Sequence, residues 1–198
     1  METRFSLVPP WQRGEDEDTL AVQVIALVEP AAPAGQAALD ESLGAVLAAP
    51  VARRVLSART PGAGSGPAGF DLIGQRSGGL GERIAGALAD AYANSTLPML
   101  LVRADTLGVT PDMLADAARS LVSSEADAAF GPAADGGFWL LGLRRPDRSL
   151  VAGIPDEGQG AGGRLLLGRL ATSGLRVALA PRLEVGGAEA LPYSALRS

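Results

Sequence analysis

Cysteine, histidine and lysine are all absent from this chain, and its 17 basic residues are therefore all arginines. The missing thiols and imidazoles exclude disulfides, thiolate nucleophiles, Ser-His triads and the usual zinc sites. The missing lysine excludes a Schiff base and the phosphate-binding lysine of a P-loop. Any bound metal must sit on oxygen ligands, which favours magnesium, manganese or calcium.

Long apolar runs and clusters of positive charge are also missing. No run approaches the ~20 apolar residues that span a bilayer, and the N-terminus lacks a basic region followed by an apolar one. A soluble, cytoplasmic protein without a membrane span is therefore expected. The net charge of -5 without a basic block argues against nucleic acid as a partner, because binding to its phosphates needs clustered cations.

The residues that are present suit one compact domain. Hydrophobic residues make up 47% of 198 residues, which is enough for a single substantial core. Residues 1–18 combine Pro9-Pro10, Trp11 and the acidic run from Glu15 to Asp18. This mixture buries little apolar surface, so residues 1–18 are expected to form a flexible lead-in to a domain over residues 19–198.

Patterns typical of strands and helices alternate along this domain. Strands are predicted over Leu20–Val28, Val51–Ala58, Phe70–Ile73, Leu97–Val102, Ala126–Phe130, Phe138–Leu143 and Arg176–Ala180. Helices are predicted over Gln36–Leu47, Leu80–Tyr92, Thr110–Val122 and Gly163–Thr172. The alternation predicts an α/β fold with a mostly parallel, mixed sheet and helices on both faces. The strand at Phe138 follows another strand with no helix between them, so it is expected to be antiparallel.

Two carboxylates stand beside predicted strand ends, where α/β proteins build ligand sites. Asp105 comes after the strand that ends at Val102, and Asp135 precedes the strand that begins at Phe138. Each has a simpler interpretation, since Asp105 can cap the loop before Thr110 and Asp-Gly-Gly is a strong turn former. Gly136 and Gly137 would also let the backbone approach a sugar or phosphate closely.

A glycine-rich loop opens the helix predicted at Leu80–Tyr92. Gly78, Gly79 and Gly81 would leave backbone N–H groups at the positive end of that helix, which suits an anion or the edge of a nucleotide base. Arg83 in the first turn would then reach a phosphate. A plain strand-to-helix turn explains the same glycines.

Three segments together resemble a bacterial family of GT-A-type proteins usually described as glycosyltransferases, which are similar in fold to nucleotidyltransferases. The segments are Gln75–Ile84, Asp105–Leu114 and Gly131–Leu143. The resemblance implies a Rossmann-like, nucleotide-diphosphosugar transferase fold with a nucleotide or nucleotide-sugar ligand. It implies catalytic roles for Asp105, as a ligand of Mg²⁺ or Mn²⁺, and for Asp135. It also implies substrate contacts from Gln75, Gly78, Gly79, Gly81, Arg83, Gly136 and Gly137.

The chain departs from the family pattern at several functional positions. The loop from Glu29 to Gln36 lacks the cations with which related nucleotidyltransferases grip a triphosphate, and Thr106-Leu107 replaces the usual Thr/Cys-Pro. Acidic positions are replaced in Asp156–Gly163 and Glu184–Gly187, although Asp156 or Glu157 could serve as a second metal ligand.

Three functional hypotheses therefore stay open. The first is metal-dependent glycosyl transfer from a nucleotide-sugar donor. The second is a catalytically degenerate member that serves as a binding or scaffold subunit, and it predicts an exposed apolar patch or an oligomer interface. A nucleotidyltransferase is the third and weaker hypothesis, and a homo-oligomer is compatible with each of them.

Overall fold

The computed structural model describes residues 19–28, 36–59, 67–156 and 161–184. The predicted lead-in, residues 1–18, lies outside the described residues. The elements follow in the order β1 (Leu20–Leu27), α1 (Gln36–Ala48), β2 (Val51–Ala58), β3 (Asp71–Gly74), α2 (Leu80–Asn94), β4 (Met99–Arg103), α3 (Pro111–Val122), β5 (Ala128–Pro132), β6 (Phe138–Leu143), α4 (Arg148–Val151), α5 (Gly162–Thr172) and β7 (Val177–Leu179). No helix in these described ranges is long and apolar enough to cross a membrane.

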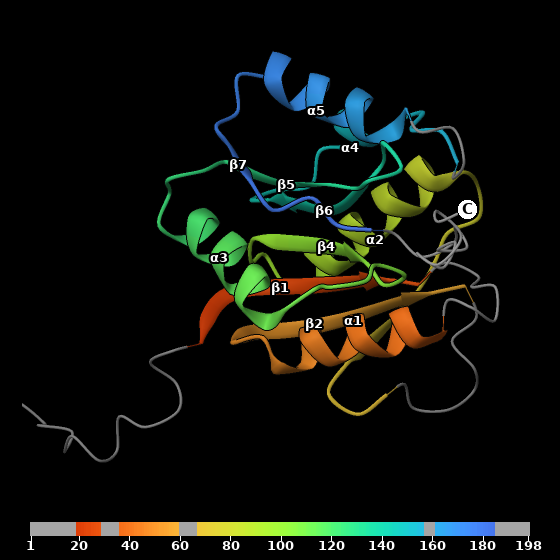
Figure 1. The fold of residues 1–198 in the computed structure, drawn as a ribbon, viewed down its shortest axis with the longest axis vertical. Helices are drawn as coiled ribbons and strands as arrows, with labels where there is room; N and C mark the ends of the chain where they lie inside the picture. Colours follow the sequence, from red (N-terminus) through yellow and green to blue (C-terminus); the bar gives the residue numbers. More distant parts are fainter. Residues whose placement is uncertain (1–18, 29–35, 60–66, 157–160, 185–198) are drawn as a thin grey trace, which may run out of the picture.

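The seven strands form one sheet in the order β3-β2-β1-β4-β6-β5-β7. β6 pairs antiparallel with both β4 and β5, and every other strand pair is parallel. The α/β fold and its single antiparallel strand at Phe138–Leu143 are thus as expected. β1 and β4 lie side by side in the middle of the sheet (Figure 1), and the chain order reverses there. A reversal of this kind is where α/β sheets place ligands, at the carboxyl ends of the strands.

Helices cover both faces of the sheet (Figure 1) and create two cores. On one face α2, α4 and α5 pack against the sheet, with Ile84 and Leu166 among the buried contacts. On the other face α1 and α3 contribute Val46 and Leu114 to a second core. The predicted coverage of both faces is therefore confirmed.

Phe138 and Trp139 begin β6 and are both buried, on opposite faces of the sheet. Pro132 pairs with Phe138 while Gly131 pairs with Leu140, so Trp139 is the extra residue of a β-bulge. A Cβ at Gly131 would lie 2.5 Å from the Trp139 ring, which is why the bulge needs a glycine here. Both aromatic side chains therefore belong to the core, one on each face of the sheet.

The local signals at helix ends act largely as expected. Thr110 caps α3, because its Oγ1 accepts a hydrogen bond from the N–H of Met113 at 3.3 Å, and Pro111 opens the helix. The short helix α4 was not predicted, since four residues are too few to show a helical period. Asp147 caps α4 by accepting from the N–H of Ser149.

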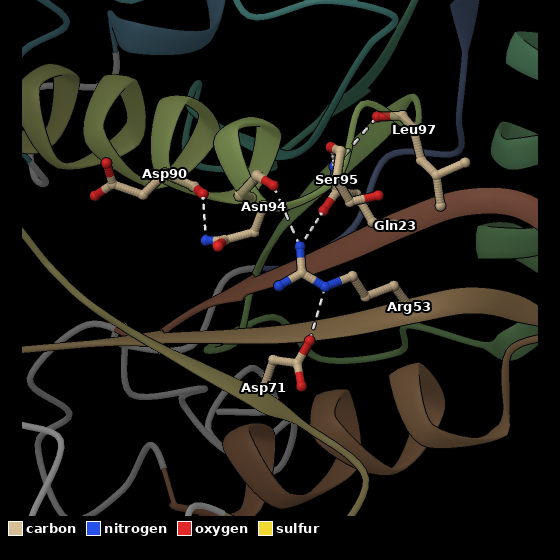
Figure 2. Close-up of polar contacts among 8 residues, drawn as sticks. Gln23, Arg53, Asp71, Asp90, Asn94, Ser95 and Leu97 are labelled. Carbon is tan, nitrogen blue, oxygen red and sulfur yellow. Dashed lines mark hydrogen bonds and ion pairs between the residues drawn. The ribbon is translucent and has the colours of Figure 1, made fainter.

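A partly buried polar network fixes the C-terminal end of α2 to the sheet (Figure 2). Arg53 of β2 donates from Nη1 to Gln23 Oε1 at 2.9 Å and to the carbonyl of Ala91 at 3.2 Å, and from Nε to Asp71 Oδ2 at 2.7 Å. Gln23, fully buried in β1, donates to the carbonyl of Ser95 at 2.7 Å. The cation beside the last carbonyls of α2 suits the negative end of a helix. This network lies at the C-terminal end of α2, so its residues are not among those at the carboxyl ends of the parallel strands.

Candidate ligand site at the carboxyl edge of the sheet

The predicted site residues lie along one edge of the sheet. Gln75 follows β3, Asp105 follows β4, and the glycines of the loop precede α2. Asp135 lies at the same edge because β6 runs antiparallel and begins where its parallel neighbours end. The fold therefore brings residues from distant segments to the reversal point between β1 and β4 and to the strands beside it.

Gln75, which follows β3, bonds the chain at the ends of β1 and β2 and leaves its side-chain oxygen without a hydrogen bond among the described residues. Its Nε2 donates to the carbonyl of Val28 at 2.8 Å and to the carbonyl of Ser57 at 3.0 Å. Its Oε1 is buried and has no hydrogen-bond partner among the described residues, and the same holds for Ser57 Oγ. A buried polar atom without a partner is costly, by ~1–3 kcal/mol. Gln75 therefore offers an oriented acceptor to a ligand N–H at this edge.

The N-terminal end of α2 is bonded by a carboxylate from another part of the chain. Asp156 Oδ1 accepts from the N–H of Leu80 at 2.6 Å and lies 3.6 Å from Nη1 of Arg83. Arg83, which is largely buried, also donates to the carbonyl of Gly78 at 2.9 Å. Asp156 thus occupies an anion position of the kind that the glycine-rich loop predicts, so an incoming phosphate has to displace it or bind beside it.

A glycine stands at each of these loop positions for a different structural reason. Gly78 has a φ of +120°, a conformation that side chains rarely adopt. A Cβ at Gly81 would overlap the carbonyl oxygen of Val151 in α4, so Gly81 allows close packing of α2 on α4. Gly79 lies beside Asp156: a Cβ added at Gly79 would be 3.5 Å from the carboxylate oxygens of Asp156. The strand-to-helix turn thus explains these glycines in part, and their contact with substrate stays a prediction.

Asp105 is buried and forms an ion pair with Arg103, two residues earlier. Arg103 Nη2 donates to Asp105 Oδ2 at 2.7 Å, and Arg103 Nε donates to Oδ1 at 3.2 Å. Arg103 is only 3% exposed and Asp105 is 9% exposed. The next residue, Thr106, is held by Ser42 of α1, whose Oγ donates to the Thr106 carbonyl at 2.6 Å. Asp105 does not cap the following helix, because Thr110 caps it.

This ion pair decides how well the site suits a divalent cation. Magnesium commonly binds through one or two carboxylates, substrate phosphates and water. Here both oxygens of Asp105 accept from a guanidinium, and Asp156 is bonded at α2. Within the described ranges, no three acidic residues are grouped so that they could hold a metal ion. The described residues therefore do not fit a preformed metal site.

Asp135 forms a tight turn before β6. Its Oδ1 accepts from the N–H of Gly137 at 2.8 Å, and Gly136 has a φ of +87°. The first turn of α5 packs directly on this turn, since Gly163 donates its N–H to the Gly136 carbonyl at 3.1 Å. A Cβ at Gly163 would overlap the Gly137 carbonyl. The turn-forming role of Asp135 is thus present, and its exposed carboxylate also faces a cleft.

A cleft of about 630 Å³ lies between the end of β5, the Asp135 turn and the start of α5. We name it the β5–α5 cleft, and it is lined by Phe130, Pro132, Ala133, Ala134, Asp135, Gly136, Gly137, Gly163, Arg164, Leu167 and Arg182. A second hollow of about 390 Å³ shares Ala134 and Arg182 with it and reaches Leu107 and Gly108 after Asp105. The two hollows are thus neighbours; Asp135 lines the first, and Asp105 lines neither.

Several residues at this edge were not singled out from the sequence. Arg103 stands two residues before Asp105, and a spacing of two places both side chains on one face of an extended chain, so a signal was present. Arg164 and Arg182 carry no such signal, because tertiary contacts place them at the cleft: the start of α5 packs on the Asp135 turn, and β7 pairs with β5. The segment 29–35, residues 157–160 and residues 185–198 lie outside the described residues, and so do the departures from the family pattern found there.

Comparisons with known proteins agree with this architecture. Residues 36–156 match the family described as "Uncharacterized protein conserved in bacteria (DUF2064)". No curated protein matches the sequence.

Several solved structures are similar to this chain, among them the following three. A protein from Desulfovibrio desulfuricans G20, provisionally assigned as a nucleotide-diphospho-sugar transferase, has a TM-score of 0.69 and 19% identity over 84% of this chain and 82% of its own. A mannosyltransferase from Pyrobaculum calidifontis, solved with GDP-Man and Mn²⁺, has a TM-score of 0.54 and 16% identity over 91% of this chain. This chain spans only 61% of that mannosyltransferase. A Mycobacterium tuberculosis H37Rv protein solved with manganese has a TM-score of 0.53 and 14% identity over 82% of this chain and 88% of its own. At these identities the likeness shows the fold alone, which is the fold of GT-A-like transferase structures.

Proposed function

The chain belongs to the DUF2064 family of bacteria, and from this premise we propose that it binds a nucleotide-diphospho-sugar and transfers the sugar to an acceptor. The fold that it shares with nucleotide-diphospho-sugar transferase structures supports this proposal. The observation that carries it is the convergence of Gln75, Asp105 and the Asp135 turn at the carboxyl edge, where the strand order reverses.

The nucleotide is proposed to bind beside β3 and the start of α2. The unused Oε1 of Gln75 suits an N–H group of a base, which would satisfy a buried acceptor. Gly78, Gly79 and Gly81 keep the backbone open to close approach, and Arg83 supplies a cation near the phosphates. The Asp156 carboxylate on the N–H of Leu80 would then have to yield to the ligand.

The sugar is proposed to lie between Asp105 and the Asp135 turn. In the transfer, an acceptor hydroxyl oxygen forms a bond to the anomeric carbon, and the bond from that carbon to the diphosphate oxygen breaks. The nucleoside diphosphate leaves with the electron pair of that bond. Asp135 is the proposed base for the hydroxyl proton, because its carboxylate is exposed and only its Oδ1 accepts a hydrogen bond among the described residues. Gly136 and Gly137 leave room for the substrate.

A role of Asp105 as a ligand of Mg²⁺ or Mn²⁺ stays a prediction. It requires that the carboxylate be free to bind the ion. The two manganese-containing structures share the fold at low identity. In this chain Arg103 must first release the carboxylate. The same ion pair favours the second hypothesis, a catalytically degenerate member that serves as a binding or scaffold subunit, since it neutralises the charge that would hold a cation.

Calorimetric titration with UDP, GDP, CDP, ADP and their sugar derivatives, in Mn²⁺ and then in EDTA, tests this proposal. We expect one base to bind and the Gln75→Leu variant to lose that preference. Gln36→Leu is the matched control, because Gln36 is exposed and bonds Asp40 within α1. Mass spectrometry of the binding donor with candidate acceptors then separates transfer from binding alone. Absence of heat from every nucleotide would contradict the proposal.

A further inference from the structure

The β5–α5 cleft contains two arginines that form no ion pair with any carboxylate in the part of the chain that the structure describes. Other described arginines form ion pairs, as Arg103 does with Asp105 and Arg176 does with Asp127. Arg164 is exposed at the start of α5 and has no hydrogen bond or ion pair among the described residues. Arg182, after β7, donates from Nη2 to the carbonyl of Ala134 at 2.7 Å, which holds its guanidinium beside the Asp135 turn.

The charge balance of the cleft is opposite to that of the chain. The whole sequence has a net charge of -5, yet the cleft is lined by two arginines and one acidic residue, Asp135. One oxygen of that carboxylate already accepts from Gly137. An anion that enters the cleft therefore meets two guanidinium groups, each able to form paired hydrogen bonds with a carboxylate or phosphate.

The floor of the cleft is apolar. Phe130 at the end of β5 is buried beneath it, and Leu167 of α5 borders it with 37% of its surface exposed. The volume of about 630 Å³ is within the range of ~300–1,000 Å³ that is typical of small-molecule sites. The cleft thus combines an apolar surface with fixed positive charge, a pattern that suits an amphipathic anion.

The position of the cleft indicates what such an anion does. Asp135 borders the cleft on one side, and the second hollow continues from Arg182 to the loop after Asp105. We infer that the β5–α5 cleft binds the sugar acceptor, and that this acceptor carries a phosphate or carboxylate on an apolar body. Arg164 and Arg182 hold its anionic group and direct its hydroxyl towards Asp135. This inference rests on the proposed transferase function.

Binding of small probes to the purified full chain tests the inference. Phenyl phosphate and benzoate carry an anion on an apolar ring, and benzyl alcohol is the uncharged counterpart. We expect the two anions to bind and benzyl alcohol not to bind. Arg164→Met and Arg182→Met should each weaken the affinity for phenyl phosphate about tenfold, the loss expected for one charge-assisted contact.

Arg145→Met is the matched control. Arg145 is likewise without an ion pair among the described residues and lines another hollow, of about 520 Å³, beyond the end of β6. Because β6 is antiparallel, its end lies at the opposite edge of the sheet. We expect Arg145→Met to bind phenyl phosphate as the wild type does. Equal affinity in all three variants and the wild type would overturn the inference.

Competition with the nucleotide separates this inference from the proposed function. Saturating nucleoside diphosphate should leave phenyl phosphate binding unchanged, whereas competitive displacement would make the cleft the donor site and overturn the inference. If a nucleotide binds and neither anion does, the inference fails alone. If both anions bind through Arg164 and Arg182 and no nucleotide binds, the transferase proposal fails, and the assignment of the anion as a sugar acceptor fails with it.

Discussion

Arg103 donates hydrogen bonds to both carboxylate oxygens of Asp105, and the two side chains are buried together at the end of β4. A buried pair of this kind is weak support for stability, but losing one partner strands the other charge. The pair also neutralises the residue that the family resemblance assigns to a metal. A divalent cation and the Arg103 guanidinium therefore compete for the same two oxygens.

We predict that Arg103→Met converts Asp105 into a metal-binding residue. Without metal the variant should lose about 3 kcal/mol of unfolding free energy, because Asp105 is left buried without its cation. Mn²⁺ should then raise the melting temperature of the variant more than that of the wild type, since a ligand that binds only the folded state stabilises it. Thermal unfolding with and without Mn²⁺ measures both effects, and electron paramagnetic resonance of free Mn²⁺ gives the affinity.

Two variants control this experiment. Arg103→Met combined with Asp105→Asn should lose the response to Mn²⁺, because the amide carries no charge. Arg176→Met frees Asp127 from an ion pair that also has two hydrogen bonds, but at an exposed position remote from the site. Mn²⁺ should not stabilise that variant. A wild type that responds to Mn²⁺ as strongly as Arg103→Met would show that the ion pair does not oppose the metal.

Asp135 offers a way to separate turn formation from catalysis. Asn at this position keeps the oxygen that accepts from Gly137 N–H, so Asp135→Asn should fold and bind donor normally. If Asp135 is the base, transfer by Asp135→Asn should fall about 100-fold or more. Asp135→Ala removes the turn bond as well and should weaken donor binding too. Donor titration and initial rates of all three proteins check this, and an Asn variant with wild-type turnover would rule out the base.

The elements were predictable because their signals are local. Leu20–Val28 and Phe138–Leu143 stand out as largely apolar runs of strand length, and Thr110-Pro111 marks the start of a helix. The antiparallel direction of β6 also followed from the sequence, since no helix is available to carry the chain back across the sheet. The bulge at Trp139 was not predictable, because it depends on the partner strand that carries Gly131.

The site was predictable only in outline. The sequence places Asp105 and Asp135 beside strand ends, and the sheet brings them to one edge. The pair of Arg103 and Asp105 had a local signal in its spacing of two residues. The bond from the N–H of Leu80 to Asp156 was not evident, because it joins segments far apart in the sequence. Arg164 and Arg182 line one cleft only because α5 packs on the Asp135 turn and β7 pairs with β5, and no local pattern indicates these contacts between distant segments.

The network of Figure 2 is expected to support stability without affecting the site. Arg53→Met leaves Gln23 Oε1, the Ala91 carbonyl and Asp71 without their shared donor. We expect a loss of about 1–3 kcal/mol in unfolding free energy, because Gln23 Oε1 is left buried without a partner. The Ala91 carbonyl still accepts from the N–H of Ser95, and Asp71 is exposed. Arg76→Met, which removes an exposed pair with Asp90, should cost less than about 1 kcal/mol. Urea denaturation measures both losses, and equal losses would contradict the structural role.

Asp127 is expected to respond to acid. The Arg176 guanidinium, mainly by hydrogen bonding, lowers the pKa of Asp127 from 3.8 to about 2. Because the folded pKa lies below the unfolded one, the stabilisation is present above pH 3.8 and is lost as the pH falls towards 2. NMR titration of the Asp127 carboxyl carbon should show a midpoint near 2, and Arg176→Met should return it towards 3.8. A midpoint that does not move in the variant would contradict the assigned cause.

The packing of α5 on the Asp135 turn can be tested by replacing Gly163 or Gly168 of this helix with alanine. Gly163→Ala places a Cβ on the carbonyl oxygen of Gly137, so the helix start or the turn must shift. We expect a loss of about 1–3 kcal/mol in unfolding free energy and weaker binding of phenyl phosphate in the β5–α5 cleft.

Gly168→Ala is the matched control in the same helix. Nothing lies within 4 Å of a Cβ added at Gly168, and alanine is the better helix former by about 1 kcal/mol. This variant should therefore be as stable as the wild type or more stable, with unchanged binding. If Gly163→Ala is also neutral in both assays, the start of α5 does not position the turn. The cleft would then have to adapt to its ligand rather than present a fixed surface to it.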